Sequence, residues 1–143
     1  MRNLILLLIA AAAQADAPKP PSTEELLVAR LETAHFSEST TPNAPKGSLG
    51  ATIGVDPVTK GATTYARTPA GTGLPAHWHS ATEYTVLLGG KGTLTIEGKQ
   101  YEVTPGSYFV IPANLVHQLT CATGADCLLL TRRGGPVDYH FVK

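Results

Sequence analysis

The sequence predicts an all-β fold, an antiparallel sandwich or small closed barrel over residues 49–143, on two observations. After residue 48 the 143-residue chain shows no helical spacing of apolar residues but short runs rich in β-branched and aromatic residues. Glycine, proline, Asp-Pro and Glu-Gly-Lys turns separate these runs at fairly even intervals. Such strands hide their edges and one apolar face by closing on one another. The predicted strands are 49–55, 63–68, 83–88, 92–98, 99–104, 107–112, 115–121, 126–132 and 137–142.

The first 15 residues are predicted to be a signal peptide. A short positive start precedes an unbroken apolar run from Leu4 to Ala13, and residues 13–15 give the small-x-small pattern of a cleavage site. At about 1.5 Å per residue, this run covers only half of a bilayer core, so a membrane anchor is the weaker alternative. We therefore expect a mature chain that begins at Asp16 and is periplasmic or secreted.

Residues 16–48 are predicted to form a tether, a short helix and a loop ahead of the barrel. Three prolines in residues 16–22 favour an extended tether. Ser22 and Glu25 form a capping box, which predicts a short helix over about residues 23–32. The sequence after this helix is loop material.

Charge excludes two classes of partner. Without Arg2, ten basic residues stand against eleven acidic ones, so the net charge of the mature chain is near −1. A nearly neutral chain without a basic cluster suits neither nucleic acid nor an anionic membrane surface. We expect a small molecule as the partner instead.

The two cysteines, Cys121 and Cys127, leave two alternatives open. Gly124 lies between them and allows a tight turn, so in an oxidising compartment they can form a disulfide. The other alternative is a pair of half-buried free thiols. Their spacing matches neither a paired-cysteine zinc motif nor a CxxC redox motif.

The stretch GTGLPAHWHSATEYTVLLGG contains the candidate site. On a β-strand, His77 and His79 point to the same side with Cα atoms about 6.6 Å apart, so both imidazoles can reach one ion. Glu83 has the same parity but lies roughly 13 Å farther along a straight strand. The chain must therefore turn at residues 80–82 and bring Glu83 back on a neighbouring strand. A third histidine, His117, lies in a later apolar run.

These residues resemble the two motifs of the cupin superfamily. The first, G-x5-HxH-x3-E-x6-G, is met with every spacing intact by Gly71, His77, His79, Glu83 and Gly90. The second, G-x5-PxG-x2-H-x3-N, is met by Gly106, Pro112 and His117. Asn114 stands where that motif has glycine and Cys121 where it has asparagine. Because asparagine tolerates positive φ, we expect the turn to survive.

The resemblance implies a cupin double-stranded β-helix, a jelly-roll-like barrel. It also implies one divalent metal ion held by His77, His79, Glu83 and His117. Neutral imidazoles and a carboxylate suit Mn, Fe, Ni, Cu, Co or Zn and leave coordination positions open. A role for Glu83 as a base is the weaker alternative. A homodimer is also implied, whereas His35 and His140 are expected to lie outside the site.

The function predicted from this site is that of an exported metalloenzyme. It would act on a small oxygenated molecule that chelates the metal, with dioxygenase-like chemistry first and isomerase or lyase chemistry next. One alternative is a periplasmic module that binds a small molecule or metal without reaction. Another is a barrel whose metal is only structural. Fold does not imply function, so the substrate, the reaction and the metal stay open.

Overall fold

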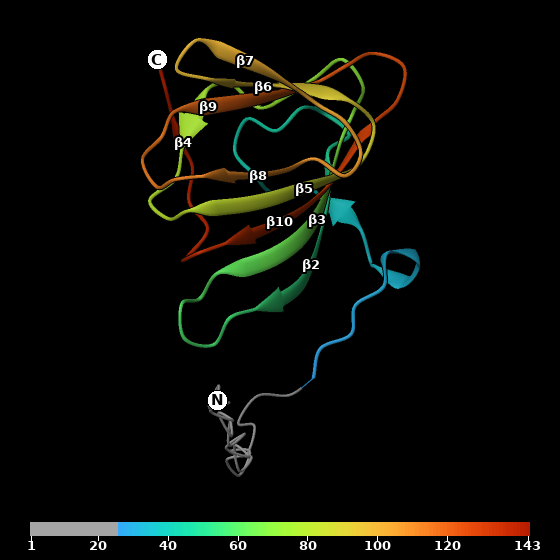
Figure 1. Cartoon of the computed structure of the whole chain (residues 1–143). Coiled ribbons are helices and arrows are strands. Elements are labelled where there is room, and N and C mark those ends of the chain that lie inside the picture. Colours follow the sequence, from blue (N-terminus) through green and yellow to red (C-terminus); the bar gives the residue numbers. More distant parts are fainter. Residues whose placement is uncertain (1–25) are drawn as a thin grey trace, which may run out of the picture.

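The computed structural model describes residues 26–143, which form two antiparallel sheets packed face to face (Figure 1). The larger sheet has six strands in the order β1-β2-β3-β10-β5-β8, and the smaller has five in the order β11-β4-β9-β6-β7. The predicted all-β fold is confirmed. The strands are β1 (Ser37–Glu38), β2 (Leu49–Val55), β3 (Ala62–Thr68), β4 (His77–Trp78), β5 (Glu83–Gly89), β6 (Gly92–Ile96), β7 (Lys99–Val103), β8 (Tyr108–Ile111), β9 (His117–Cys121), β10 (Cys127–Arg133) and β11 (His140–Phe141).

Alternation along the strands places one set of side chains between the sheets. In β5, Glu83, Thr85 and Leu87 are buried, and the residues between them are more exposed. β10 follows the same rule, because Cys127 and Leu129 face inward. The same alternation places the polar side chains of Glu83 and Thr85 inside the barrel.

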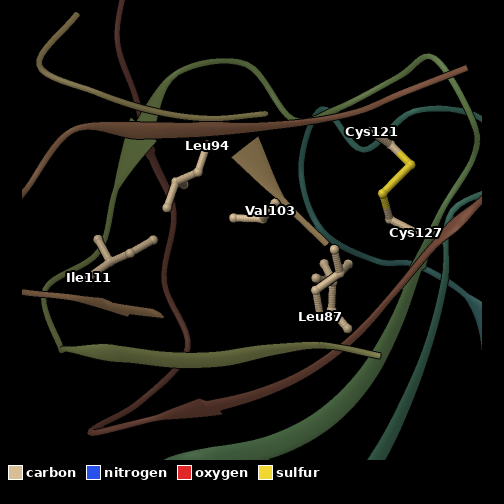
Figure 2. Packing of buried hydrophobic residues seen from close by; sticks show 7 residues of the cluster. Leu87, Leu94, Val103, Ile111, Cys121 and Cys127 are labelled. Atoms are coloured by element: carbon tan, nitrogen blue, oxygen red, sulfur yellow. A yellow bond between two sulfur atoms is a disulfide. The ribbon is translucent and has the colours of Figure 1, made fainter. Parts of the chain in front are cut away.

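An apolar core fills one part of the space between the sheets. Its buried members come from both sheets, and Figure 2 shows several of them pointing toward one another. They are Leu87, Leu94, Val103, Ile111, Cys121, Cys127 and Leu129. Close packing of this core fixes how the two sheets sit on each other.

The predicted N-terminal helix is wrong for the residues that the structure describes. Residues 26–30 carry no helix, and only a 3-10 turn, Leu31–Thr33, follows them. Most helical stability in proteins comes from burying an apolar face, and here Leu26 and Leu27 remain 90% and 62% exposed. The predicted start signal was therefore not enough to hold residues 26–32 in an α-helix without a surface to pack against.

The predicted signal peptide and the predicted loop before the barrel both concern the N-terminal part of the chain. The predicted signal peptide, residues 1–15, lies outside the described residues. Within residues 26–143, no helix has the length and apolar character needed to cross a membrane. The segment predicted as a loop begins with a short strand, β1, which joins the larger sheet because Ser37 and Glu38 pair with Gly50 and Leu49.

The motif glycines lie at turns with positive φ. Gly71, Gly90 and Gly106 have φ of 73°, 76° and 92°. Asn114, which replaces the glycine of the second motif, has φ 65°, so the expectation that asparagine preserves this turn is confirmed. Gly90 has a second constraint, because a Cβ there would clash with the Asp126 carbonyl oxygen.

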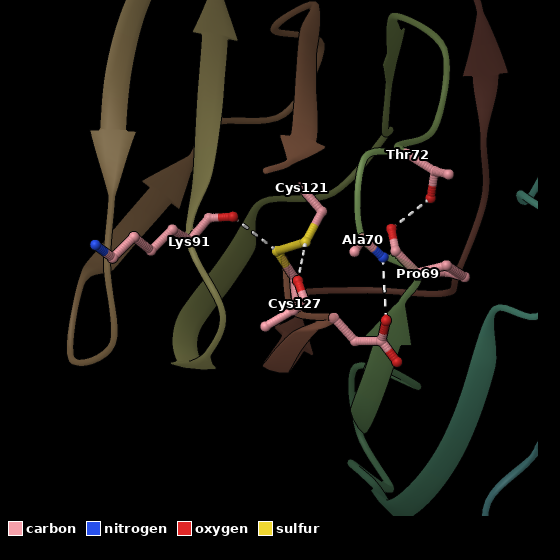
Figure 3. Close-up of a disulfide and its surroundings, with 8 residues drawn as sticks. Pro69, Ala70, Thr72, Lys91, Cys121 and Cys127 are labelled. Carbon is pink, nitrogen blue, oxygen red and sulfur yellow. Dashed lines mark hydrogen bonds between the residues drawn. A yellow bond between two sulfur atoms is a disulfide. The ribbon is translucent and has the colours of Figure 1, made fainter. Parts of the chain in front are cut away.

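The two cysteines form a disulfide, which decides between the two alternatives left open by the sequence. Both are almost fully buried, and the turn between them is tied to the loop before β4 (Figure 3). The Ala70 backbone N–H donates to the Asp126 carboxylate at 3.1 Å, and the Cys121 N–H donates to the Thr72 carbonyl at 2.7 Å. The disulfide thus closes the end of the barrel at which β9 finishes.

We expect Gly90→Ala to destabilise the protein more than Gly98→Ala. Both glycines have nearly the same φ, 76° and 78°, but a Cβ at Gly98 meets no atom within 4 Å. Strain from positive φ costs about 1–3 kcal/mol in either variant, and only Gly90→Ala adds the clash. Urea unfolding measures both free energies. Equal losses would contradict the proposed close approach at Gly90.

We expect reduction of the disulfide to lower the free energy of unfolding by about 2 kcal/mol, because the loop that it closes is short. The protein would be reduced while unfolded in urea, and its refolded stability compared with that of the oxidised protein. The double variant Cys121→Ala/Cys127→Ala is the control, since its unfolding should not respond to reductant. An oxidised, denatured sample that contains free thiols would show that the bond is not formed.

Candidate metal centre

Three histidines from two adjacent strands meet inside the barrel. β4 pairs antiparallel with β9 so that His77 lies directly opposite His117. His79 follows β4 at the spacing of the same face. All three are buried, with exposed fractions of 3% to 4%. One nitrogen from each ring lies within 4.8 Å of the others, which is a distance that one ion can bridge.

Backbone carbonyls fix the orientation of the three rings. Each ring has its Nδ1 at hydrogen-bond distance from a carbonyl oxygen: Pro75 for His77 at 2.7 Å, Asp138 for His79 at 2.6 Å and Leu115 for His117 at 2.9 Å. A carbonyl oxygen can only accept, so each Nδ1 carries the proton. The Nε2 atoms are then left with free lone pairs, which is the arrangement that metal-binding histidines require.

Burial keeps the histidines neutral. It lowers the pKa of His77 and of His79 from 6.5 to about 4, and it also lowers the pKa of His117. Carbonyl hydrogen bonds oppose this effect in each ring without reversing it. Neutral imidazole is the form that coordinates a metal ion.

Glu83 reaches the cluster from the opposite sheet. The predicted turn at residues 80–82 is present, but it carries the chain to β5 in the larger sheet and not to a neighbour of β4. The Glu83 Oε2 atom lies 3.2 Å from His79 Nε2. The same oxygen forms an ion pair with Arg133, and Thr85 donates its hydroxyl to Oε1 at 2.7 Å. Glu83 thus lies between the histidines and an arginine.

The contact between His79 and Glu83 fits a cation. His79 Nε2 is buried and accepts no hydrogen bond from any described residue. Its lone pair faces a carboxylate oxygen, and two acceptors at 3.2 Å repel each other unless a positive charge lies between them. A divalent transition metal would satisfy this contact and bind the three imidazoles, although the group of mutually close ligand atoms comprises His77, His79 and His117 and not Glu83. The donor set fits Mn, Fe, Ni, Cu, Co or Zn and does not distinguish among them.

Two residues of the site were missed by the sequence reasoning. Arg133 ends β10 and is buried inside the barrel, and the predicted strand stopped one residue earlier. The signal was present, because Arg133 has the same parity as the inward-facing Leu129. Tyr139 packs its ring against His77 and His79, with ring centroids 5.6 and 4.9 Å away. Tyr139 approaches the histidines because the C-terminal segment folds back along β4. No pattern in the sequence predicts this pairing.

The other two histidines lie outside the three-histidine cluster. His140 is at the surface, where it stacks on Trp78 at 3.9 Å and contacts Asp138. His35 lines the wall of the cavity beside the cluster. Neither contributes a nitrogen to the group of three.

A cavity of about 580 Å³ opens beside the three histidines. This volume suits a small organic ligand. Both sheets and the segment before β2 line it, and the lining includes His77, Glu83, His117, Arg133 and Tyr139. Three of the four candidate ligands, His77, Glu83 and His117, therefore border a space large enough for a substrate.

Comparison with known proteins agrees with this geometry. Residues 64–131, which include all four candidate ligands, match the cupin domain family. The chain carries a cupin domain. No curated protein matches its sequence. The resemblance of the two motifs to those of cupins is therefore confirmed at the level of the family.

Solved structures show the same cupin fold at low sequence identity. The polyketide cyclase RemF from Streptomyces resistomycificus has 18% identity and a TM-score of 0.68, over 83% of this chain and 87% of its own. An RmlC-like cupin from Shewanella frigidimarina has 18% identity and a TM-score of 0.60, over 75% and 89%. An oxalate oxidase has 22% identity and a TM-score of 0.60, over 80% and 62%. At this identity the likeness extends to the fold alone.

We expect the stability of the metal-free cupin to fall as the pH drops from 6.5 toward 4. In that window the unfolded chain binds protons at these histidines and the folded chain does not, so protons favour unfolding. Urea unfolding of chelator-treated protein at a series of pH values measures the slope. His79→Gln removes one of the three groups and should reduce it. A free energy of unfolding that stays constant between pH 6.5 and 5 would contradict the burial of neutral histidines.

Proposed function

We propose that this cupin is an exported metalloprotein that binds one divalent transition metal and acts on a small oxygenated molecule in its cavity. The observation that carries the proposal is the convergence of three neutral, orientated imidazoles on one point at the cavity wall. A site built for structure alone is closed by its ligands, whereas this one borders open space. An open position is what a metal needs to meet a substrate.

Glu83 is the fourth ligand in this proposal. Its Oε2 atom lies 3.2 Å from His79 Nε2, a separation at which two neighbouring donors can bind one ion. The Thr85 hydroxyl donates to the other carboxylate oxygen, and the Thr131 hydroxyl lies 3.0 Å from the Thr85 hydroxyl. These hydrogen bonds fix the orientation of the carboxylate. Binding the ion would weaken the contact of Glu83 with Arg133.

The reaction favoured is dioxygenase-like, with isomerase or lyase chemistry next. When bound, a divalent ion supplies Lewis acidity that polarises a substrate oxygen. The chain's own residues supply the rest: the apolar wall from Leu94, Phe109 and Ile111 excludes water, and Arg133 and Tyr139 present hydrogen-bond donors to a substrate. An oxalate oxidase and a polyketide cyclase share this fold, which shows that the fold accommodates different chemistries.

Export is part of the proposal and has one support besides the first 15 residues. Disulfides form and persist in oxidising compartments, and Cys121 and Cys127 are joined. A periplasmic or secreted location agrees with both observations.

We expect protein purified from its own compartment to hold about one metal ion per chain, detected by elemental analysis. His77→Ala and His117→Ala should each lose most of this metal, because a chelate with fewer imidazoles is weaker. His140→Ala is the matched control and should keep it, since His140 lies outside the cluster. Full metal content in His117→Ala would contradict the proposed site.

Turnover separates an enzyme from a binding module. The metal-loaded protein would be assayed for product formation and oxygen uptake with phenolic, diketone and sugar-acid compounds. We expect turnover that His117→Ala abolishes. A bound compound recovered unchanged, with no turnover of any class, would favour the alternative of a non-catalytic periplasmic binding protein.

A further inference from the structure

Arg133 is a buried cation in the wall of the cavity. Its side chain is 9% exposed, and its Nη1 atom forms the ion pair with Glu83. Its Nη2 atom donates to the Tyr139 hydroxyl at 3.4 Å, and the guanidinium carbon lies 5.5 Å from the centre of the Tyr139 ring. The arginine is therefore held between Glu83 and Tyr139, and both of these residues contact His79.

The single carboxylate of Glu83 lies next to two positions for positive charge, the Arg133 guanidinium and the proposed metal ion. It neutralises Arg133 in the structure, and the proposed function assigns it to the metal ion. Once Glu83 binds a divalent ion, the charges of the ion, the carboxylate and the guanidinium sum to about +2. Buried charges without counter-ions are costly, and burial already lowers the pKa of Arg133. The loaded cavity therefore favours an anion.

The other carboxylates near the cavity do not fully neutralise this positive charge. Asp138 is near enough to stabilise the charge of Arg133, but its carboxylate accepts the Ser80 N–H at 3.0 Å and contacts His140 at 3.1 Å. Its side chain is also 32% exposed, so water screens it. Glu38 lines the cavity from the exposed strand β1. Neither forms an ion pair with Arg133.

We propose that Arg133 is the specificity-determining residue of the site and that it binds the carboxylate of a small acid bearing a hydroxyl or carbonyl oxygen on the adjacent carbon. The proposal rests on the proposed function, because it needs a metal at the histidines. The guanidinium presents paired N–H groups that match a carboxylate, and the Tyr139 hydroxyl beside it adds a further donor. The adjacent oxygen then lies on the side of the metal.

The rest of the cavity defines the body of this acid. Its wall carries apolar side chains, Leu94, Phe109 and Ile111, together with hydroxyl groups. One of them, the Ser48 hydroxyl oxygen, is buried and has no hydrogen-bond partner among the described residues. A ligand with an apolar part and a polar substituent would use both, and about 580 Å³ admits a molecule larger than a two-carbon acid.

The test is calorimetric binding to zinc-loaded protein, because zinc has no redox chemistry and keeps the ligand intact. The probes are three 2-hydroxy acids, glycolate, lactate and mandelate, each paired with its neutral amide. Wild type is compared with Arg133→Gln, Arg133→Lys and Tyr139→Phe. Arg132→Gln is the matched control: it removes the same charge one residue away, from an exposed arginine paired with Asp56 on the outside of the barrel. Zinc content is measured for every variant.

We expect wild type to bind at least one acid more tightly than its amide, and Arg133→Gln to lose at least about tenfold in affinity for that acid while amide binding stays unchanged. Arg133→Lys keeps the charge without the planar fork and should lose less; Tyr139→Phe should lose a few-fold. Arg132→Gln should match wild type. If Arg133→Gln does not fold, the affinities for the acid and for its amide are compared in Arg133→Lys and Tyr139→Phe instead.

Three results would overturn the proposal, and they are distinguishable. Zinc retained together with unchanged acid affinity in the Arg133 variants overturns this role of Arg133 alone, as does a wild type that shows no preference for any acid over its amide. A wild type that does not hold zinc overturns the proposed function as well.

Discussion

The site depends on one register, the antiparallel pairing that sets His77 of β4 opposite His117 of β9. Side chains alternate along a strand, so a slip by one residue would turn His117 away from the cavity. The two neighbouring β6 and β11 strands hold this register, with Ile96 opposite His117 and Phe141 opposite His77. Backbone carbonyls then fix each ring through Nδ1. The fold thereby converts sequence spacing into a preorganised set of nitrogen donors.

Glu83 contacts residues of both sheets of the barrel, His79 from the smaller sheet side and Arg133 in the larger sheet. The larger sheet provides both Glu83 and Arg133, opposite each other in the register of β5 and β10, while the smaller sheet provides the histidines. In the proposed site this carboxylate lies between Arg133 and the metal ion, so binding of the ion would release the arginine for an anion. Electrostatics alone would then connect the charge of the ligand to the occupancy of the metal site.

The sequence was sufficient for those features that local spacing encodes. The alternation of residues predicted the strands of the barrel, and the two motifs predicted that His77, His79 and His117 would meet. Features that depend on the tertiary fold were not accessible. The helix over residues 23–32 had a good start signal but no apolar surface to cover, as the exposed Leu26 and Leu27 show. Tyr139 reaches His77 because the C-terminal segment returns along β4, and no residue pattern specifies that return.

The central claim is that three imidazoles coordinate one ion through Nε2, and X-ray absorption spectroscopy of the zinc-loaded protein tests it most directly. The account predicts a first shell of nitrogen and oxygen donors at about 2.0–2.2 Å, with the outer-shell scattering of three histidine rings. A first shell that contains sulfur, or scattering from fewer than three imidazoles, would contradict it.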